Sequence, residues 1–322
     1  MKPLVSIICP TYNHEKYITD AIESFLMQKV EFPIEIIIHD DASTDATADI
    51  IRSYEKKYPT IIKPIYQKEN QYSKGKPPTY FIYKRAQGKY IASCEGDDYW
   101  TDPYKLKKQV EFLENHPEYI AVTHNVRVVN EYNKLIKNNF NEFKIFDEHV
   151  YTIRDAEKLK MPFQTASKMY RNIWVKIPEI IFRLYLECNA NGDRKNALML
   201  AFMGKVYCMA DILAVHRKIV SLGDSWNAKH YWKNMIFHHY NTIKELNKFA
   251  MNAFGVKLNN EEIRINIIVN AIVKMIYKPN KENMKVVKEI LKISDESKLD
   301  IFRELSLRGI KKINKSIKSI LK

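Results

Sequence analysis

Three carboxylates stand close together in the stretch Tyr90–Trp100, which reads YIASCEGDDYW. The apolar run Tyr90–Cys94 predicts a buried strand, and three acids follow it directly: Glu95, Asp97 and Asp98. Carboxylates crowded at the end of a buried strand repel one another, and a divalent cation would relieve that repulsion. Gly96 would let the backbone approach a ligand closely. Taken alone, the stretch fits equally well an acidic turn in which Asp97 or Asp98 caps the next helix.

Polar residues also follow the first two predicted strands. Leu4–Cys9 (LVSIIC) and Ile34–His39 (IEIIIH) are short apolar runs of the kind found in buried parallel strands. The polar residues that follow them are Thr11, Tyr12, Asn13, Asp40 and Asp41. Ligands of open α/β sheets bind at the carboxyl ends of parallel strands. We therefore expect these residues and the three acids to converge on one nucleotide pocket.

The elements that position these residues alternate between strand and helix. Amphipathic helices are predicted after the first two strands, with Asn13 as N-cap of one and Ser43 or Thr44 as cap of the other. Further strands are predicted at Ile61–Tyr66, Tyr119–Asn130, Phe163–Tyr170, Lys205–Met209 and Ile212–Arg217, and further helices at about Thr79–Gln87 and Pro103–Asn115. This alternation predicts an α/β fold with a mostly parallel central sheet and helices on both faces.

Glycine becomes rare after about Ser225, and helical periodicity dominates from there. We expect a domain at 1–224 and a helical C-terminal extension at 225–322, with helices at Tyr231–Phe254, Asn260–Tyr277, Lys281–Ile293 and Leu299–Leu321. Within Phe302–Lys322 an apolar stripe is flanked by lysines and arginines. Such a helix could lie on an anionic membrane surface, or it could pack on its own domain with a solvated basic face.

Composition narrows the class of protein. The 322 residues carry 52 lysines and arginines against 38 acids, a net charge of +14, which suits anionic partners without choosing among them. The four cysteines are scattered and predict reduced core thiols of a cytoplasmic protein, with no disulfide framework or zinc site. We expect neither a signal peptide nor a membrane span, because no apolar run approaches the ~20 residues that a span needs.

Together these motifs resemble the family 2 glycosyltransferases of GT-A fold. VSIICPTYN resembles the first strand and loop of that family, IEIIIHDDASTDAT its second strand and acid-rich turn, and GKYIASCEGDDYW the strand that ends in a DxD-type motif. The segment Asn191–Arg194, with the helix after it and Lys205–Arg217, resembles the part that carries the catalytic acid. The resemblance covers about Leu4 to Arg217 and implies a Rossmann-like sheet.

The resemblance implies inverting transfer of a sugar from a nucleotide-diphosphate sugar, a UDP-sugar before others. The acceptor would be a hydroxyl of a glycan or lipid-linked molecule, in bacterial capsule, lipopolysaccharide or exopolysaccharide synthesis. The enzyme would work in the cytoplasm, either free or at the inner face of the plasma membrane. A Mn²⁺ or Mg²⁺ ion would stabilise the departing diphosphate.

The same resemblance implies roles for single residues. Thr11, Tyr12 and Asn13 would line the nucleotide pocket, with Asp41 on the base and Asp40 near the ribose. Asp97 and Asp98 would hold the ribose and the metal, whereas the longer Glu95 is not expected to bind the metal directly.

Three later residues complete the implied site, each with a structural alternative. Asp193 would be the catalytic base, or else it only caps the helix that follows it. His216 would touch metal or phosphate, although a lone histidine on a strand is more often structural. Arg217 could contact the diphosphate. The loop Lys68–Pro78 could close over the donor, or be only a solvated loop.

Two other classes of function remain open. A sugar-phosphate nucleotidyltransferase also uses a parallel sheet and acidic metal sites, but it usually carries a glycine-rich basic loop after the first strand, and PTYNHEKY is not one. The chain also lacks GxGxxG and GxxxxGK[ST]. A non-catalytic basic scaffold or nucleic-acid-binding protein would carry basic residues interleaved with aromatics on one surface. Here the strand ends are acidic instead, which would repel phosphate unless a metal is present. We therefore expect no nucleic acid as partner.

Overall fold

The computed structural model describes residues 2–136, 148–219 and 232–308. By its internal packing the chain divides into two compact units. The first comprises Met1–Leu186 and Gly192–Ser221, and the second comprises Glu187–Asn191 and Leu222–Lys322. The assignment of a catalytic domain to 1–224 and an extension to 225–322 stays a prediction.

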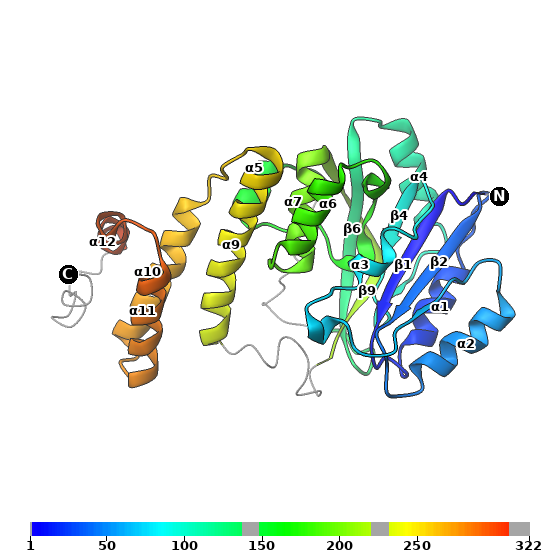
Figure 1. Cartoon of the computed structure of the whole chain (residues 1–322), viewed down its shortest axis with the longest axis horizontal. Helices are drawn as coiled ribbons and strands as arrows, with labels where there is room; N and C mark the ends of the chain where they lie inside the picture. Colours follow the sequence, from blue (N-terminus) through cyan, green and yellow to red (C-terminus); the bar gives the residue numbers. More distant parts are fainter. Residues whose placement is uncertain (1, 137–147, 220–231, 309–322) are drawn as a thin grey trace. The chain divides into compact units, whose positions relative to one another are not determined.

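The first unit is built on one mixed sheet (Figure 1). Its strands among the described residues are β1 (Val5–Thr11), β2 (Ile34–Asp40), β3 (Ile65–Tyr66), β4 (Tyr90–Ser93), β5 (Tyr99–Trp100), β6 (Tyr119–Asn130), β7 (His149–Tyr151), β8 (Met169–Arg171) and β9 (Lys205–Lys218). They lie in the order β3-β2-β1-β4-β8-β6-β9-β5, and β7 pairs with β9. The strands β1 to β4 are parallel, whereas β8 runs antiparallel to both β4 and β6.

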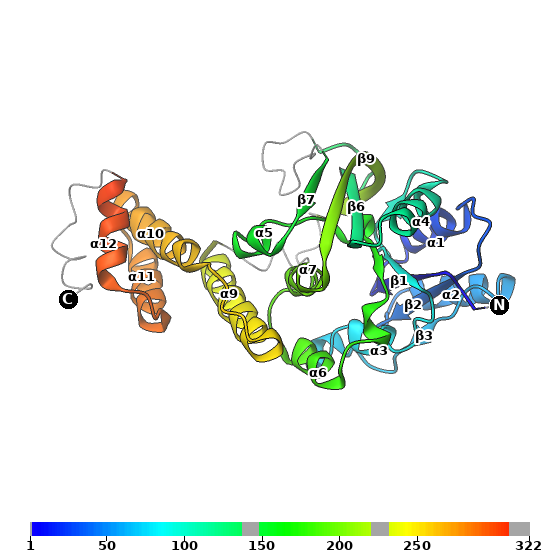
Figure 2. The ribbon, with the colours of Figure 1, turned by 90° about the horizontal axis from the view of Figure 1, so that it is seen from above.

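Helices cover both faces of this sheet, as the sequence predicts (Figure 2). One face carries α1 (Ile18–Leu26), α2 (Thr47–Lys57) and α4 (Lys105–Asn115), which pack on side chains of β1 and β2 in one buried core. On the other face lie α3 (Thr79–Ile82) and α6 (Glu179–Glu187). The remaining elements are η1 (Tyr72–Lys74), α5 (Ile153–Glu157), η2 (Thr165–Ser167), η3 (Ile173–Val175) and α7 (Gly192–Met203). The predicted α/β architecture is confirmed.

Several predicted elements have other boundaries. The strand expected at Ile61–Tyr66 shrinks to β3, and Ile62 forms only an isolated bridge with Ile36. Phe163–Tyr170 is not one strand but the 3₁₀ turn η2 followed by β8. Only Thr79–Ile82 of the helix expected at Thr79–Gln87 forms as α3.

The two short strands expected at Lys205–Met209 and Ile212–Arg217 are one long strand, β9. Register shifts against β6 on either side of Asn125 absorb the polar residues between them. The side chain of Asn125 donates to the Ala210 carbonyl at 2.9 Å, so the bulge is held by a hydrogen bond. This continuity lets the one strand β9 pair with β6, β5 and β7.

The second unit is helical among its described residues: α9 (Trp232–Phe254), α10 (Glu261–Tyr277), α11 (Lys281–Ile293) and α12 (Lys298–Leu307). Their apolar faces form one core around Ile268, Ile272, Val287 and Ile301. The basic stretch Phe302–Lys322 lies mostly outside the described residues, which end at Arg308. Of the helices described, none has both the length and the apolar character that crossing a membrane requires.

Candidate functional site

The three acids of the central stretch lie together at the carboxyl end of β4. One carboxylate oxygen each from Glu95, Asp97 and Asp98 can be chosen so that all lie within 4.8 Å of one another. The turn is tied to the end of β1, because the Gly96 N–H donates to the Pro10 carbonyl at 3.0 Å. The expected clustering of these acids therefore occurs, and the side chain of Asp98 is completely buried.

Strand pairing brings Asp98 to His216. β5 runs antiparallel to β9, with Tyr99 opposite Val215, so the residue before β5 lies beside the residues after Val215. The backbone N–H of Arg217 donates to Asp98 Oδ1 at 2.7 Å, and His216 Nδ1 lies 3.2 Å from both Asp98 oxygens. Gln164 Nε2 lies 2.7 Å from the same imidazole nitrogen. His216 therefore belongs to the acid cluster, although its register in the sequence is ambiguous.

The electrostatics of the cluster show an excess of negative charge. Burial raises the pKa of Glu95 well above its usual range, and the charges of Asp97, Asp193 and Asp98 raise it further. Burial alone would lower the pKa of His216, but Asp98, Asp97 and Glu95 outweigh it and raise that pKa to about 9. Carboxylates and imidazole are accepted ligands of Mn²⁺, and carboxylates of Mg²⁺. This donor set fits a divalent cation, whose charge would offset the repulsion.

Arg217 holds the acidic turn in place. Its side chain is 2% exposed, and the guanidinium donates to the Asp97 carbonyl, to Asp20 on α1 at 2.9 Å and to Asn133 at 2.8 Å. The rings of Tyr17 and Tyr99 lie under the same cation at 4.5 and 5.2 Å. The suggested contact with a diphosphate does not fit this position, and the residue acts instead on the backbone that carries the acids.

Gly96 is needed for a close approach inside the protein, whereas the close approach of a ligand there stays a prediction. A Cβ atom at this position would lie 2.5 Å from Thr11 Oγ1 and 2.9 Å from His14 Nδ1. His14 Nδ1 is itself 3.1 Å from Thr11 Oγ1, and its Nε2 lies 3.9 Å from Asp97. Sequence reasoning missed His14. The only available signal was its place in the polar loop after the first strand.

Asn13 joins the first loop to the second instead of capping a helix. Its backbone has a positive φ of 54°, and its Oδ1 accepts the Thr44 N–H at 2.8 Å. The helix α1 begins only at Ile18, so the predicted N-cap is wrong. The predicted caps of α2, Ser43 or Thr44, are wrong as well, because α2 begins at Thr47 and Asp45 accepts the N–H of that residue at 3.0 Å.

The two acids after β2 are both engaged within the protein. Asp40 accepts a 2.5 Å hydrogen bond from the Ser43 hydroxyl, and burial raises its pKa. Asp41 is 4% exposed and accepts the backbone N–H groups of Gln71 at 2.8 Å and Tyr72 at 3.0 Å. Asp41 therefore fixes the start of η1, the part of the Lys68–Pro78 loop nearest the predicted base pocket.

Thr11 and Tyr12 differ in exposure. Thr11 is buried at the end of β1, and its carbonyl accepts the Asp41 N–H at 3.1 Å, which places the ends of β1 and β2 side by side. The Tyr12 ring is 42% exposed and is available to a ligand at this edge. The first two strand ends thus converge as expected.

Asp193 lies in the first turn of α7. Its Oδ1 accepts a hydrogen bond from Thr165 Oγ1 at 3.1 Å and lies 3.6 Å from Lys168 Nζ. Thr165 follows Gln164, which contacts His216, so Asp193 lies near the acid cluster, and its charge raises the pKa of Glu95. The structure therefore brings the predicted base toward the acid cluster. The partners Thr165 and Lys168 were not singled out in the sequence.

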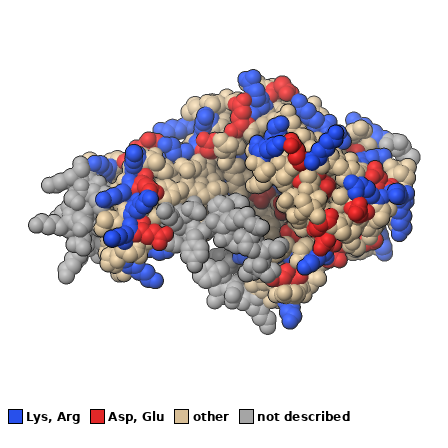
Figure 3. Space-filling model, turned by 60° about the horizontal axis from the view of Figure 1, so that its bottom comes forward, with Lys and Arg blue, Asp and Glu red and all other residues tan. Residues whose placement is uncertain are grey.

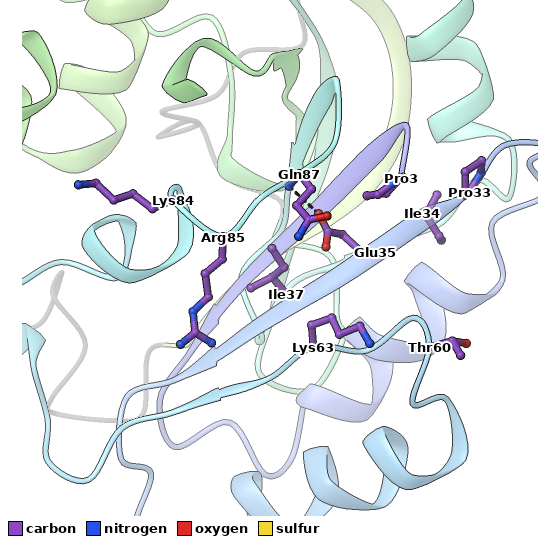
Figure 4. Close-up of a pocket in the computed structure, with 10 residues that line it drawn as sticks. All are labelled: Pro3, Pro33, Ile34, Glu35, Ile37, Thr60, Lys63, Lys84, Arg85 and Gln87. Carbon is purple, nitrogen blue, oxygen red and sulfur yellow. Dashed lines mark hydrogen bonds between the residues drawn. The ribbon is translucent and has the colours of Figure 1, made fainter. Parts of the chain in front are cut away.

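A separate groove opens at the other end of the parallel strands. Its volume is about 510 Å³, and it is lined by residues at the start of β2, including Ile34, Glu35 and Ile37, with Arg85 and Gln87 opposite (Figure 4). The hydrogen bond from the Gln87 N–H to Glu35 ties its two walls together. None of the predicted site residues lines this groove.

The surface charges are mixed. On the face that Figure 3 shows, lysines and arginines alternate with acids and do not gather into one basic patch. That face therefore offers no stripe of the kind that tracks a nucleic-acid backbone.

Comparison with known proteins places the chain in a family. The sequence model described as "Glycosyl transferase family 2" matches residues 6–174. The chain belongs to this family. An uncharacterized protein of Mycobacterium tuberculosis is 47% identical over 129 residues, which are 39% of this chain and 36% of that protein. The putative teichuronic acid biosynthesis glycosyltransferase TuaG of Bacillus subtilis is 44% identical over 112 residues, 35% of this chain and 42% of TuaG.

The matched part of this chain thus covers less than half the length of these two relatives. Among solved structures, Staphylococcus aureus TarS in complex with UDP-GlcNAc aligns with a TM-score of 0.59 at 21% identity, over 90% of this chain and 80% of that one. The mannosyltransferase PcManGT of Pyrobaculum calidifontis, in complex with GDP-Man and Mn²⁺, aligns with a TM-score of 0.52 at 16% identity, over 100% and 85%. At these identities the structural likeness establishes the fold, which is the GT-A-like fold expected from the sequence.

Proposed function

We propose that this chain is a metal-dependent, inverting glycosyltransferase. It would move a sugar from a nucleotide-diphosphate sugar, with UDP-sugars as first candidates, to a hydroxyl of a glycan or lipid-linked acceptor in surface polysaccharide synthesis. The observation that carries the proposal is the buried cluster of Glu95, Asp97, Asp98 and His216 at the carboxyl end of β4, with Asp193 close to it. Family membership and the names of the relatives agree with it.

The donor would enter at the shared edge of β1, β2 and β4. There Thr11 and Asp41 lie side by side, and Tyr12 offers an exposed ring for the base. Asp97 and Asp98, with His216, would hold Mn²⁺ or Mg²⁺, which would stabilise the negative charge of the diphosphate as it departs. Two neighbours of this fold were solved with such partners, UDP-GlcNAc in TarS and GDP-Man with Mn²⁺ in PcManGT.

Asp193 would be the general base. Its carboxylate would accept the proton of the acceptor hydroxyl while the hydroxyl oxygen attacks the anomeric carbon. The bond from that carbon to the diphosphate breaks on the opposite face, so the anomeric configuration inverts. Asp193 suits this role because it lies near the acid cluster and its carboxylate is about two-fifths exposed, within reach of a substrate.

The test is a titration calorimetry series with UDP, GDP, CDP and dTDP, each with and without Mn²⁺. We expect one diphosphate to bind only with metal, and Asp98→Asn to abolish that binding. Asp211→Asn is the matched control, because Asp211 is a half-exposed carboxylate of β9 outside the cluster. Failure of every diphosphate to bind with Mn²⁺ would refute the proposal, and so would equal binding by Asp98→Asn.

A further inference from the structure

The segment Gln164–Lys168 touches both halves of the proposed site. At its start, Gln164 lies 2.7 Å from His216 in the acid cluster. One residue later, Thr165 donates to Asp193, and Lys168 places its ammonium 3.6 Å from the same carboxylate oxygen. A single five-residue segment therefore contacts the predicted metal side and the predicted base.

Hydrogen bonds to its backbone carbonyls fix this segment from three directions. The Trp100 indole N–H donates to the Ala166 carbonyl at 2.9 Å, and Gln109 Nε2 donates to the Ser167 carbonyl at 2.9 Å. The Ser93 N–H, at the end of β4, donates to the Lys168 carbonyl at 3.2 Å. Because its backbone is held by β4, β5 and α4, the segment can present Thr165 and Lys168 in a fixed geometry.

Lys168 is an unusual residue for a structural position. Its side chain is 6% exposed, and its ammonium lies 4.6 Å from the centre of the Phe163 ring. Burying an ammonium is costly unless it is paired, and the partner here is Asp193, with the charge of Glu95 also acting on it. The buried cation thus faces two carboxylates that would otherwise repel each other.

We propose that Lys168, together with Thr165, is a positioning residue for the base Asp193, an inference that rests on the function proposed above. The ammonium and the hydroxyl both approach Oδ1, so they fix the orientation of the carboxylate. A carboxylate held in one orientation can meet the acceptor hydroxyl in the geometry that proton transfer needs.

The chain offers a matched control for loss of a buried lysine. Lys195 is also buried, lies 4.7 Å over the Tyr185 ring, and donates to the Tyr185 carbonyl at 3.1 Å. Lys195→Met therefore removes a buried ammonium and a ring contact of the same kind on the same helix as Asp193. It separates a general cost of losing a buried cation from a specific effect on the base.

The experiment compares Lys168→Met, Lys168→Arg, Asp193→Asn, the double variant Lys168→Met/Asp193→Asn and Lys195→Met. Turnover of the donor sugar is measured at saturating Mn²⁺, using the diphosphate class that binds in calorimetry. We expect Lys168→Met to lower kcat by ~100-fold, the lower range for loss of a general base, with the donor KM changed less than ~2-fold. Lys168→Arg should recover part of the loss, and Lys195→Met should keep kcat within ~3-fold of the parent protein.

The double variant decides whether Lys168 acts through Asp193. If it does, adding Lys168→Met to Asp193→Asn lowers kcat no further, because the base is already absent. The same fold-loss in both backgrounds would overturn the proposal, and so would loss of diphosphate binding by Lys168→Met.

A parent protein that turns over no donor would instead refute the proposed function. The interaction between Lys168 and Asp193 is then tested by thermal unfolding of the same variants. A smaller loss of Tm from Lys168→Met in the Asp193→Asn background supports the pair, and additive losses overturn it.

Discussion

Lys105 is a buried lysine without a carboxylate partner among its described contacts, and its charge should make stability depend on pH. It lies at the start of α4, fully buried, with Nζ 4.0 Å from the centre of the Trp100 ring and 2.7 Å from Gln109 Oε1. Burial lowers its pKa from 10.5 to about 7. The substitution Lys105→Met keeps the length and apolar stem and removes the ammonium.

The magnitude follows from the two pKa values. The gap between 10.5 in the unfolded chain and about 7 in the folded one corresponds to about 5 kcal/mol at about 1.4 kcal/mol per pH unit. Between these pH values the unfolded chain binds the proton and the folded chain does not. Stability contributed at Lys105 therefore rises as pH increases, and from pH 7 to pH 9 the gain is about 2 kcal/mol. Below pH 7 the penalty is constant.

The assay is urea denaturation followed by tryptophan fluorescence at several values from pH 6 to pH 9. The difference between the parent protein and Lys105→Met isolates this group, because neighbours such as Cys94 and His124 are present in both. We expect the parent to gain about 2 kcal/mol relative to the variant over pH 7 to 9. The constant loss of the Gln109 partner, about 1–3 kcal/mol, shifts the curve without changing its slope.

Lys107→Met is the matched control. Lys107 lies on the same helix but is half-exposed and pairs loosely with Glu111, so its removal should leave the pH slope unchanged. A difference between parent and Lys105→Met that stays constant from pH 6 to 9 would refute the reasoning, since it would mean that the ammonium keeps its ordinary pKa in the folded chain.

Three further predictions concern the site. Gly96→Ala forces a Cβ to 2.5 Å from Thr11 Oγ1, so urea denaturation should show a loss of about 1–3 kcal/mol, and unchanged stability would mean that the loop yields at no cost. Arg217→Met removes three side-chain hydrogen bonds from a buried guanidinium and should cost at least about 2 kcal/mol by the same measurement; a smaller loss would contradict its role in holding the acidic turn. Asp41→Ala leaves the N–H groups of Gln71 and Tyr72 without their acceptor, so limited proteolysis should cut this loop faster, whereas an unchanged rate would show that the loop does not depend on Asp41.

The sequence predicts the sheet and its site edge well where the signal is local. The strands β1, β2 and β4 are short, largely apolar runs, and the acids that follow β4 cluster at its carboxyl end. Burial on both faces leaves a continuous apolar pattern, and such a pattern needs no information from distant residues. The helical periodicity after residue 232 is equally local, and its first three helices form as predicted.

The predictions that are wrong concern features that depend on residues far away in the sequence. The bulge that joins two expected strands into β9 exists because β6 pairs along its whole length, and a pairing register cannot be read from either strand alone. The predicted helix caps are wrong for a similar reason. Asn13 looks like a cap from its position before a helix, but its side chain instead accepts an N–H from the loop after β2, 31 residues away.

The role of Arg217 shows why the local sequence pattern must be combined with the pairing of distant strands. A cation beside a proposed diphosphate site is expected to bind the diphosphate. The Arg217 guanidinium instead binds a carbonyl 120 residues away and an acid on α1. Only the pairing of β5 with β9 places it there, and the same pairing delivers His216 to Asp98. One strand register thus sets both the support of the acidic turn and the imidazole inside the cluster. A substitution that shifts β9 by one residue would turn each of these two side chains to the face opposite the one it now occupies, and it should abolish metal-dependent diphosphate binding.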